Sequence, residues 1–206
     1  MLNEFIDLLK IQSYEVLGNV LGCSLAIEFA HQADQRLKRL ILTSPFFINK
    51  EEDSKHLLGI LAPSQMLVKG SARFARQVYE LWLKSVTLNL NTHYRNMVIS
   101  GSGKNELEQF EREGTIDIIV NCFREASKQT LKGISHEMQS CLTPSNLDLS
   151  KITIPVDLWW GTEDVRFTRE GVEELAEQLP NSKTHIKEGY SEHIYYALFE
   201  EIIRSN

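Results

Sequence analysis

The sequence has few of the residues that mark several protein classes. Its 206 residues include only three cysteines, Cys23, Cys122 and Cys141. An odd, widely spaced set argues against a disulfide framework and against a C-x-x-C metal site, so we expect a reducing, cytoplasmic setting. No apolar run approaches the length of a membrane span, and the acid-bearing amino-terminal stretch is unlike a secretory signal peptide.

An excess of basic residues is also lacking. The 22 lysines and arginines are outnumbered by 28 acidic residues, which gives a formal net charge of −6. Because nucleic-acid phosphates attract basic surfaces, this balance argues against a nucleic-acid partner. Hydrophobic residues make up 42% of the chain and charged residues 24%, which is typical of a folded globular domain with a core of its own.

Motifs for metals and nucleotides are missing as well. The segment HEMQS begins like the zinc motif H-E-x-x-H but ends in Ser140 instead of a second histidine. No phosphate-binding G-x-G-x-x-G or G-K-[ST] pattern occurs, and the histidines show no ligand spacing. We therefore expect no metal and no cofactor.

What the chain does contain is strand–helix alternation at both ends. A strand–helix–strand unit with short connections predicts a right-handed parallel crossover, so the pattern predicts an α/β fold with about four mostly parallel strands. We predict strands at 14–18, 38–44, within 152–164 and at 183–187, and helices at 2–11, 22–32, 168–179 and 193–204.

The middle of the chain is helical in pattern. We predict that 1–44 form the first part of an α/β core, 45–150 an inserted helical segment, and 151–206 the second part of the core. Phe74, Val78, Leu81, Trp82 and Leu88 are predicted to share a broad apolar face. Helix packing is the favoured interpretation of such a face, and a lid over a ligand pocket is the alternative.

The segment EVLGNVLGCSLAIEFA, residues 15–30, looks like a strand, a tight glycine turn and a helix. Its turn has the spacing of the G-x-S-x-G nucleophile motif, with Val20 where the nucleophile belongs. A valine side chain can neither attack a substrate nor give up a proton. Cys23 and Ser24 lie beyond the apex, on the helix. The glycines Gly18 and Gly22 are expected to serve the tight turn and a close approach of helix to strand.

Two more segments complete a chain order of nucleophile position, acid and histidine. Asp164 follows the strand in IPVDLWWGTED, and His193 precedes the last helix in EGYSEHIYYALF. Together with the elbow, they resemble the carboxyl-terminal portion of an α/β-hydrolase of the lidded esterase, C–C hydrolase and haloalkane dehalogenase type, over 1–44 and 152–206. The fold implied is a truncated α/β-hydrolase fold.

The resemblance implies that Asp164 orients His193 and stabilises its protonated form, while His193 acts as general base. Both residues follow carboxyl ends of parallel strands, where they can meet in one crevice. The alternative is that Asp164 is an ordinary turn acid and His193 a helix-start residue with local hydrogen bonds.

The sequence departs from the family pattern at three points. Val20 closes the covalent acyl-enzyme route. The Leu21 N–H is a candidate oxyanion donor, but the loop that supplies the usual second donor has no counterpart. The strands that precede the elbow strand in the family are missing too. We expect the resulting bare sheet edge to be covered by a second copy of the chain, with dimerisation through the helical insertion as the competing geometry.

Three functions remain open. The first is a catalytically degenerate α/β-hydrolase-like protein that acts in binding or assembly, with a small apolar ligand under the lid. The second is a residual hydrolase, or a His/Asp general-base enzyme, acting on a small apolar ester or ketone-like substrate. The third is a piece of an ordinary hydrolase without a selected function. Neither a nucleic acid nor a membrane is expected as a partner.

Overall fold

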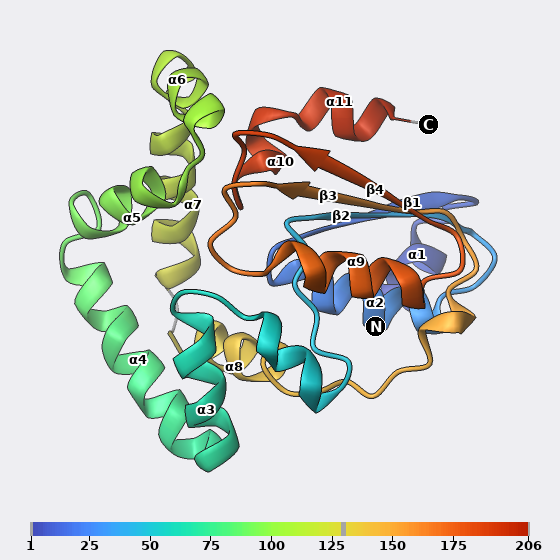
Figure 1. Cartoon of the computed structure of the whole chain (residues 1–206), viewed down its shortest axis with the longest axis horizontal. Helices are drawn as coiled ribbons and strands as arrows, with labels where there is room; N and C mark the ends of the chain where they lie inside the picture. The colour runs from blue at the N-terminus through green and yellow to red at the C-terminus, as the bar shows by residue number, and fades with distance from the viewer. Residues whose placement is uncertain (1, 129–130, 206) are drawn as a thin grey trace.

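The computed structural model describes residues 2–128 and 131–205 and has a parallel sheet at its centre (Figure 1). The strands follow one another across the sheet in chain order, and every neighbouring pair is parallel. They are β1 (Tyr14–Asn19), β2 (Leu37–Thr43), β3 (Val156–Gly161) and β4 (Ser182–Lys187). The predicted α/β class with four parallel strands is therefore confirmed.

Helices cover both faces of this sheet (Figure 1). On one face lie α2 (Gly22–Gln32) and α9 (Arg169–Gln178), and on the other lie α10 (Ile194–Ala197) and α11 (Phe199–Arg204). Thr168 caps α9 by accepting the Gly171 N–H, as its place before the helix predicted. The single helix expected at 193–204 is wrong, because Leu198 leaves the helical region at φ −116° and ψ 24° and divides it.

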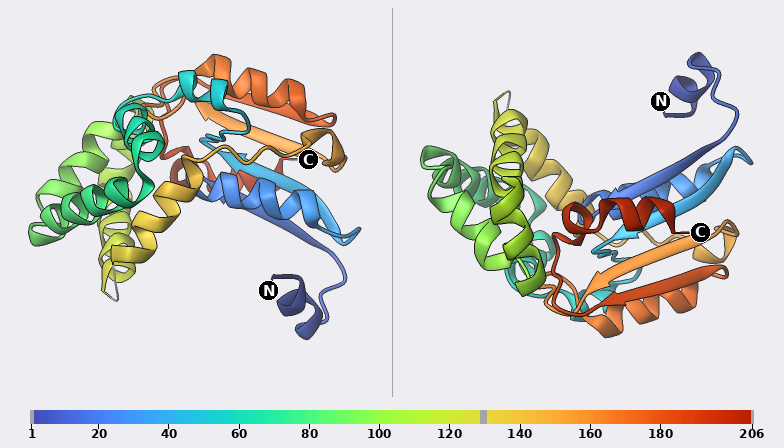
Figure 2. Two further views of the ribbon diagram at one scale, coloured as in Figure 1. Left: turned by 90° about the horizontal axis from the view of Figure 1, so that it is seen from below. Right: turned by 90° about the horizontal axis from the view of Figure 1, so that it is seen from above.

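The α-helices between β2 and β3 gather at the end of the sheet toward which the strands run (Figures 1 and 2). No described helix is both long enough and apolar enough to cross a membrane. The elements between β2 and β3 are η1 (Glu51–His56), α3 (Leu61–Gly70), α4 (Ala72–Leu88), α5 (His93–Gly101), α6 (Lys104–Glu113), α7 (Thr115–Ser127), α8 (Leu131–Cys141) and η2 (Leu149–Lys151).

The two central strands, β2 and β3, are buried on both faces, as parallel strands between helical layers usually are. Successive side chains along a strand point to opposite faces. On β2, Leu40 and Leu42 belong to the main core cluster, which also contains Ile27 of α2. Ile41, between them, belongs to a separate cluster on the opposite face with Ile202 of α11.

The first helix, α1 (Leu2–Leu8), stands apart from the rest of the fold, beyond the β1 edge of the sheet (Figure 2). Its Phe5 and Leu8 are exposed, and so is Leu25 on α2. Among the described strands, β1 pairs only with β2 and has an open outer edge, as the resemblance predicted.

Most of the apolar face predicted for α4 does not pack inward, although its Val78 and Trp82 are partly buried. Phe74, Leu81 and Leu88 are 55%, 71% and 87% exposed. The buried side of this helix instead carries Ala75, Tyr79, Leu83 and Val86. Both sets recur at helical spacing, so periodicity alone could not decide which one faces the core.

Candidate functional site

The turn after β1 joins the strand to α2, and Val20, which was predicted at the nucleophile position, lies in this turn. Val20 has a φ of +51°, between the last strand residue, Asn19, and the start of α2. The left-handed region is unfavourable for a β-branched side chain. Two backbone hydrogen bonds hold it there, from the Val20 N–H to the Thr43 carbonyl and from the Cys23 N–H to the Val20 carbonyl, both 3.0 Å. The turn therefore keeps a strained conformation around a hydrocarbon side chain.

Of the two elbow glycines, only one is required by close packing. A Cβ at Gly18 would lie 2.8 Å from the Cys23 Cα and 2.9 Å from the Ala26 Cβ. Gly18 therefore allows α2 to approach β1, as predicted. A Cβ at Gly22 would meet nothing within 4 Å, so the steric requirement expected there is wrong for the described residues.

The neighbours of Val20 do not replace it as a nucleophile. The Cys23 thiol is buried and donates to the Thr43 carbonyl at 3.5 Å, and burial raises its pKa far above the usual range. The Ser24 hydroxyl is buried and donates to the Phe46 carbonyl at 3.3 Å. Since a thiolate is the reactive form of cysteine, this burial and raised pKa disfavour reaction at Cys23.

The candidate oxyanion donor, the Leu21 N–H, has no hydrogen-bond acceptor within the described residues. The Leu21 carbonyl accepts the Cys141 thiol at 3.5 Å. Oxyanion sites usually align at least two donors on the developing charge, and the Leu21 N–H is the one donor that the sequence predicted.

Asp164 follows β3 in a tight turn and is buried. Its carboxylate accepts the N–H groups of Arg166 and Phe167, at 2.7 and 3.2 Å, and the hydroxyl of Ser44. Ser44 itself directly follows β2 and has a φ of +48°. Burial raises the pKa of Asp164 to about 6, although the hydrogen bonds from Ser44 and Arg166 oppose that rise.

His193 immediately precedes α10, and its ring is largely enclosed. Its Nε2 is buried without a hydrogen-bond partner and lies 3.7 Å from Oε1 of Glu192. The Phe110 ring on α6 meets it edge-on, with ring centroids 6.3 Å apart. Burial lowers the pKa of His193, and the Glu192 carboxylate counters that shift. Among the hydrogen bonds of the described residues, none joins His193 to Asp164.

An ion pair missed by the sequence reasoning lies between the acid turn and the histidine loop. Arg166 donates with Nη2 to Oε1 of Glu192 at 2.9 Å and with Nε to the other carboxylate oxygen. Glu192 is buried, so a two-pronged pair of this kind is a strong link. The available signal was position: Arg166 follows Asp164 by two residues, and Glu192 directly precedes His193.

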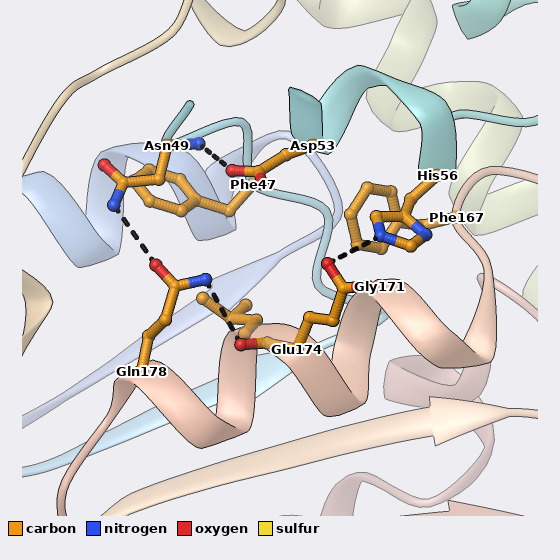
Figure 3. A pocket seen from close by; sticks show the side chains of 9 residues that line it. Phe47, Asn49, Asp53, His56, Phe167, Gly171, Glu174 and Gln178 are labelled. Atoms are coloured by element: carbon orange, nitrogen blue, oxygen red, sulfur yellow. Dashed lines mark hydrogen bonds and ion pairs between the residues drawn. The ribbon is translucent and has the colours of Figure 1, made fainter. Parts of the chain in front are cut away.

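A small pocket lies elsewhere, between η1 and α9 (Figure 3). On its wall His56 Nε2 lies 3.0 Å from Oε2 of Glu174. None of the predicted site residues lines it. The described residues also contain no group of three or more His, Cys, Asp or Glu side chains that could hold a metal ion.

Comparisons with known proteins place the fold. No family model matches the sequence, and no curated protein matches it significantly. Solved structures do resemble it. MGS-M2, an alpha/beta hydrolase enzyme from a Medee basin deep-sea metagenome library, has a TM-score of 0.63 and 16% identity, over 97% of this chain and 66% of its own.

Two further structures agree. An esterase from Exiguobacterium antarcticum has a TM-score of 0.60 and 16% identity, over 97% of this chain and 67% of its own. A bromoperoxidase from Bacillus anthracis has a TM-score of 0.61 and 16% identity, over 98% of this chain and 68% of its own. The chain has the α/β-hydrolase fold and spans about two thirds of the length of these proteins.

Proposed function

We propose that this chain, an α/β-hydrolase fold, lacks covalent hydrolase chemistry and acts in binding or assembly. The observation that carries the proposal is Val20 at the strained apex of the elbow, at φ +51°. The position that would present a nucleophile presents a side chain without a labile proton, and Cys23 and Ser24 are buried beside it. The acyl-enzyme route needs a nucleophile at that apex.

The surroundings of Asp164 and His193 support the same proposal. The Asp164 carboxylate accepts hydrogen bonds from the Ser44 hydroxyl and from two backbone N–H groups. The Nε2 of His193 lies beside α5, where a Cβ at Gly101 would be only 3.9 Å away. In this arrangement the acid does not orient the imidazole, which is its part in a catalytic triad.

The test is hydrolysis of short-chain p-nitrophenyl esters by the wild-type chain, by Val20→Ser and by His193→Ala. We expect all three to match the buffer background. Turnover by the wild type that His193→Ala abolishes would instead support the alternative, a general-base enzyme. A covalent ester adduct on the wild-type polypeptide would overturn the proposal outright.

The general-base alternative has one observation in its favour. Burial lowers the pKa of His193, so the imidazole is neutral near pH 7, which is the form that accepts a proton. Under this alternative, His193 and Asp164 would act on water or on a small apolar ester or ketone-like substrate without a covalent step.

The domain assignment is part of the proposal. Residues 1–44 and 151–206 would form the α/β core, and 45–150 would act as a lid above a small apolar ligand. Phe110 and Tyr196 supply apolar and aromatic surface around His193, which supports a ligand of that kind. Titration with apolar esters and ketones, followed by tryptophan fluorescence, tests this part, and an unchanged signal throughout would contradict it.

Assembly would use the open edge of β1. Unpaired strand edges beside apolar side chains favour pairing with another chain, and the exposed Phe5, Leu8 and Leu25 lie on α1 and α2 near that edge. We propose a homodimer there. The competing dimer would use the exposed α4 stripe of Phe74, Leu81 and Leu88.

Light scattering on matched variants separates the two dimers. Leu8→Lys should dissociate a β1-edge dimer and leave an α4 dimer intact, whereas Leu81→Lys should do the opposite. A monodisperse monomer for the wild-type chain at all concentrations would contradict both geometries.

A further inference from the structure

Glu106 is a fully buried carboxylate in the inserted helices. It lies on α6 at 0% exposure. Its oxygens accept the Gly103 N–H at 2.6 Å, the Ser191 N–H at 2.8 Å and the Ser191 hydroxyl at 2.6 Å. A buried charge is costly unless hydrogen bonds compensate it, and here three donors converge on one side chain.

An ordinary helix cap explains only part of this arrangement. Glu106 is the N3 residue of α6, and its bond to the Gly103 N–H is the usual return bond of a capping box. A cap of that kind needs neither complete burial nor further donors. The two bonds to Ser191, 85 positions along the chain, therefore call for another explanation.

The same turn of α6 is attached to the histidine loop at other points. The Asn105 N–H donates to the Gly189 carbonyl at 3.0 Å, and the Asn105 side-chain amide donates to the Glu188 carbonyl at 3.0 Å. A Cβ at Gly103 would lie 2.5 Å from the Gly189 oxygen, so the two backbones are in direct contact.

The link continues from Ser191 to His193. The Ser191 hydroxyl that donates to Glu106 also accepts the backbone N–H of His193, at 3.3 Å. Glu106 thus reaches the imidazole-bearing residue through a single side chain. The Nε2 of the His193 ring has no hydrogen-bond partner among the described residues, so the ring is placed by the loop that carries it and by the rings packed against it, such as Phe110.

We propose that Glu106 is a positioning residue, which fixes residues 188–193, and through them His193, from the inserted helix α6. The inference rests on the proposed function only in assigning His193 a role in the site. Its test uses no activity measurement, so it can fail while the proposed function stands, and the reverse also holds.

The first variant is Glu106→Gln. A glutamine keeps the size of the side chain but puts an N–H donor opposite the Gly103 N–H or the Ser191 N–H. Loss of a charge-assisted bond should speed hydrogen exchange at the Ser191 amide roughly 10- to 100-fold. The His193 ring should become more solvated, and its pKa, followed by NMR, should rise toward the ordinary value.

Matched variants separate positioning from general loss of stability. Ser191→Ala removes both bonds of the hydroxyl, the one donated to Glu106 and the one accepted from the His193 N–H, and leaves the α6 cap intact. It therefore tests the link even if Glu106→Gln does not fold. Glu111→Gln changes an exposed carboxylate on the same helix and should alter neither readout. If Glu106 acts through Ser191, the double variant should shift the His193 pKa no further than the larger single change.

Three results would overturn the inference. One is an unchanged His193 pKa in both Glu106→Gln and Ser191→Ala. Another is full additivity of the two shifts in the double variant. The third is an equal effect from Glu111→Gln, which would show that any loss of charge on α6 has the same consequence.

Discussion

The hydroxyl of Ser44, at the end of β2, donates a hydrogen bond to the carboxylate of Asp164, at the end of β3. Both side chains are buried, and the two strands are neighbours in the sheet. Asp164, which was expected to orient His193, therefore bonds instead to Ser44 and to backbone groups of its own turn. The loop that carries His193 is bonded to α6.

Asp164→Asn should stabilise the protein at alkaline pH. An asparagine can still accept the Arg166 and Phe167 N–H groups with its oxygen and can donate to Ser44 with its amide. The folded-state pKa of Asp164, about 6, lies above an unfolded value near 3.9, so ionisation opposes folding above pH 6. We expect the variant to be more stable by about 2–3 kcal/mol at pH 8.

The sign of this effect fixes the pH window. As the pH falls from 6 toward 4, Asp164 becomes protonated in the folded wild type, and the wild type becomes more stable. The unfolding free energies of the wild type and the variant should therefore converge. Urea unfolding at pH 4.5 and pH 8 measures both. Glu111→Gln, at an exposed site, should show no such trend. A variant that loses stability relative to the wild type at pH 8 would contradict the assignment.

Glycine should be preferred to alanine at the elbow apex. Val20 lies at φ +51°, where a Cβ is unfavourable, so Val20→Gly should be more stable than Val20→Ala by about 1 kcal/mol. Leu21, next in the chain, has φ −56° and ψ −35° and provides the matched control. There alanine should be the more stable by about 0.5–1 kcal/mol. Thermal unfolding of the four variants tests whether glycine is the more stable residue at position 20 and alanine at position 21. The same order of stability at both positions would contradict this prediction.

The packing of α4 predicts unequal costs for two leucines two residues apart. Leu83 is buried, so Leu83→Ala should cost about 2–4 kcal/mol of unfolding free energy. Leu81 is exposed, so Leu81→Ala should stay within about 0.5 kcal/mol. Chemical denaturation of dilute protein measures both, and similar costs would mean that the helix packs with a different face.

The thiols should differ sharply in reactivity. Cys122 is exposed, whereas Cys23 and Cys141 are buried, and burial raises the pKa of Cys141 to about 11. We expect Ellman's reagent to modify one thiol per native chain and three in denaturant. Cys122→Ser should abolish the native reaction, and rapid modification that persists in that variant would contradict the buried placement of the other two.

The sheet could be predicted because each strand carries local signals. The strand within 152–164 is an apolar run that ends at Gly161, where a Cβ would lie 2.1 Å from the Tyr190 carbonyl oxygen. The turn around Val20 was equally readable, since Gly18 is required by the approach of α2. The apolar run of the strand and the glycines of the turn can be recognised from residues close in sequence, whereas the contact of Gly161 with Tyr190 appears only in the fold.

The orientation of α4 could not be predicted, because two stripes of apolar residues share its helical period. The partners of Asp164 escaped prediction for a similar reason. Chain order shows which strand ends Asp164 and His193 follow, but it does not fix the direction of a side chain. The sequence predicts Ser44 only as the last residue of the strand at 38–44, and it indicates no partner for Arg166.

The contact between Glu106 and Ser191 also bears on how the chain reaches its native state. It joins segments 85 positions apart, and closing a loop of that length costs entropy before any contact rewards it. The β1–β2 unit can form from residues that are close in sequence. The contact between α6 and the loop before α10 forms only after two distant segments of the chain have met. Refolding followed at the His193 ring should therefore lag behind refolding followed by backbone circular dichroism.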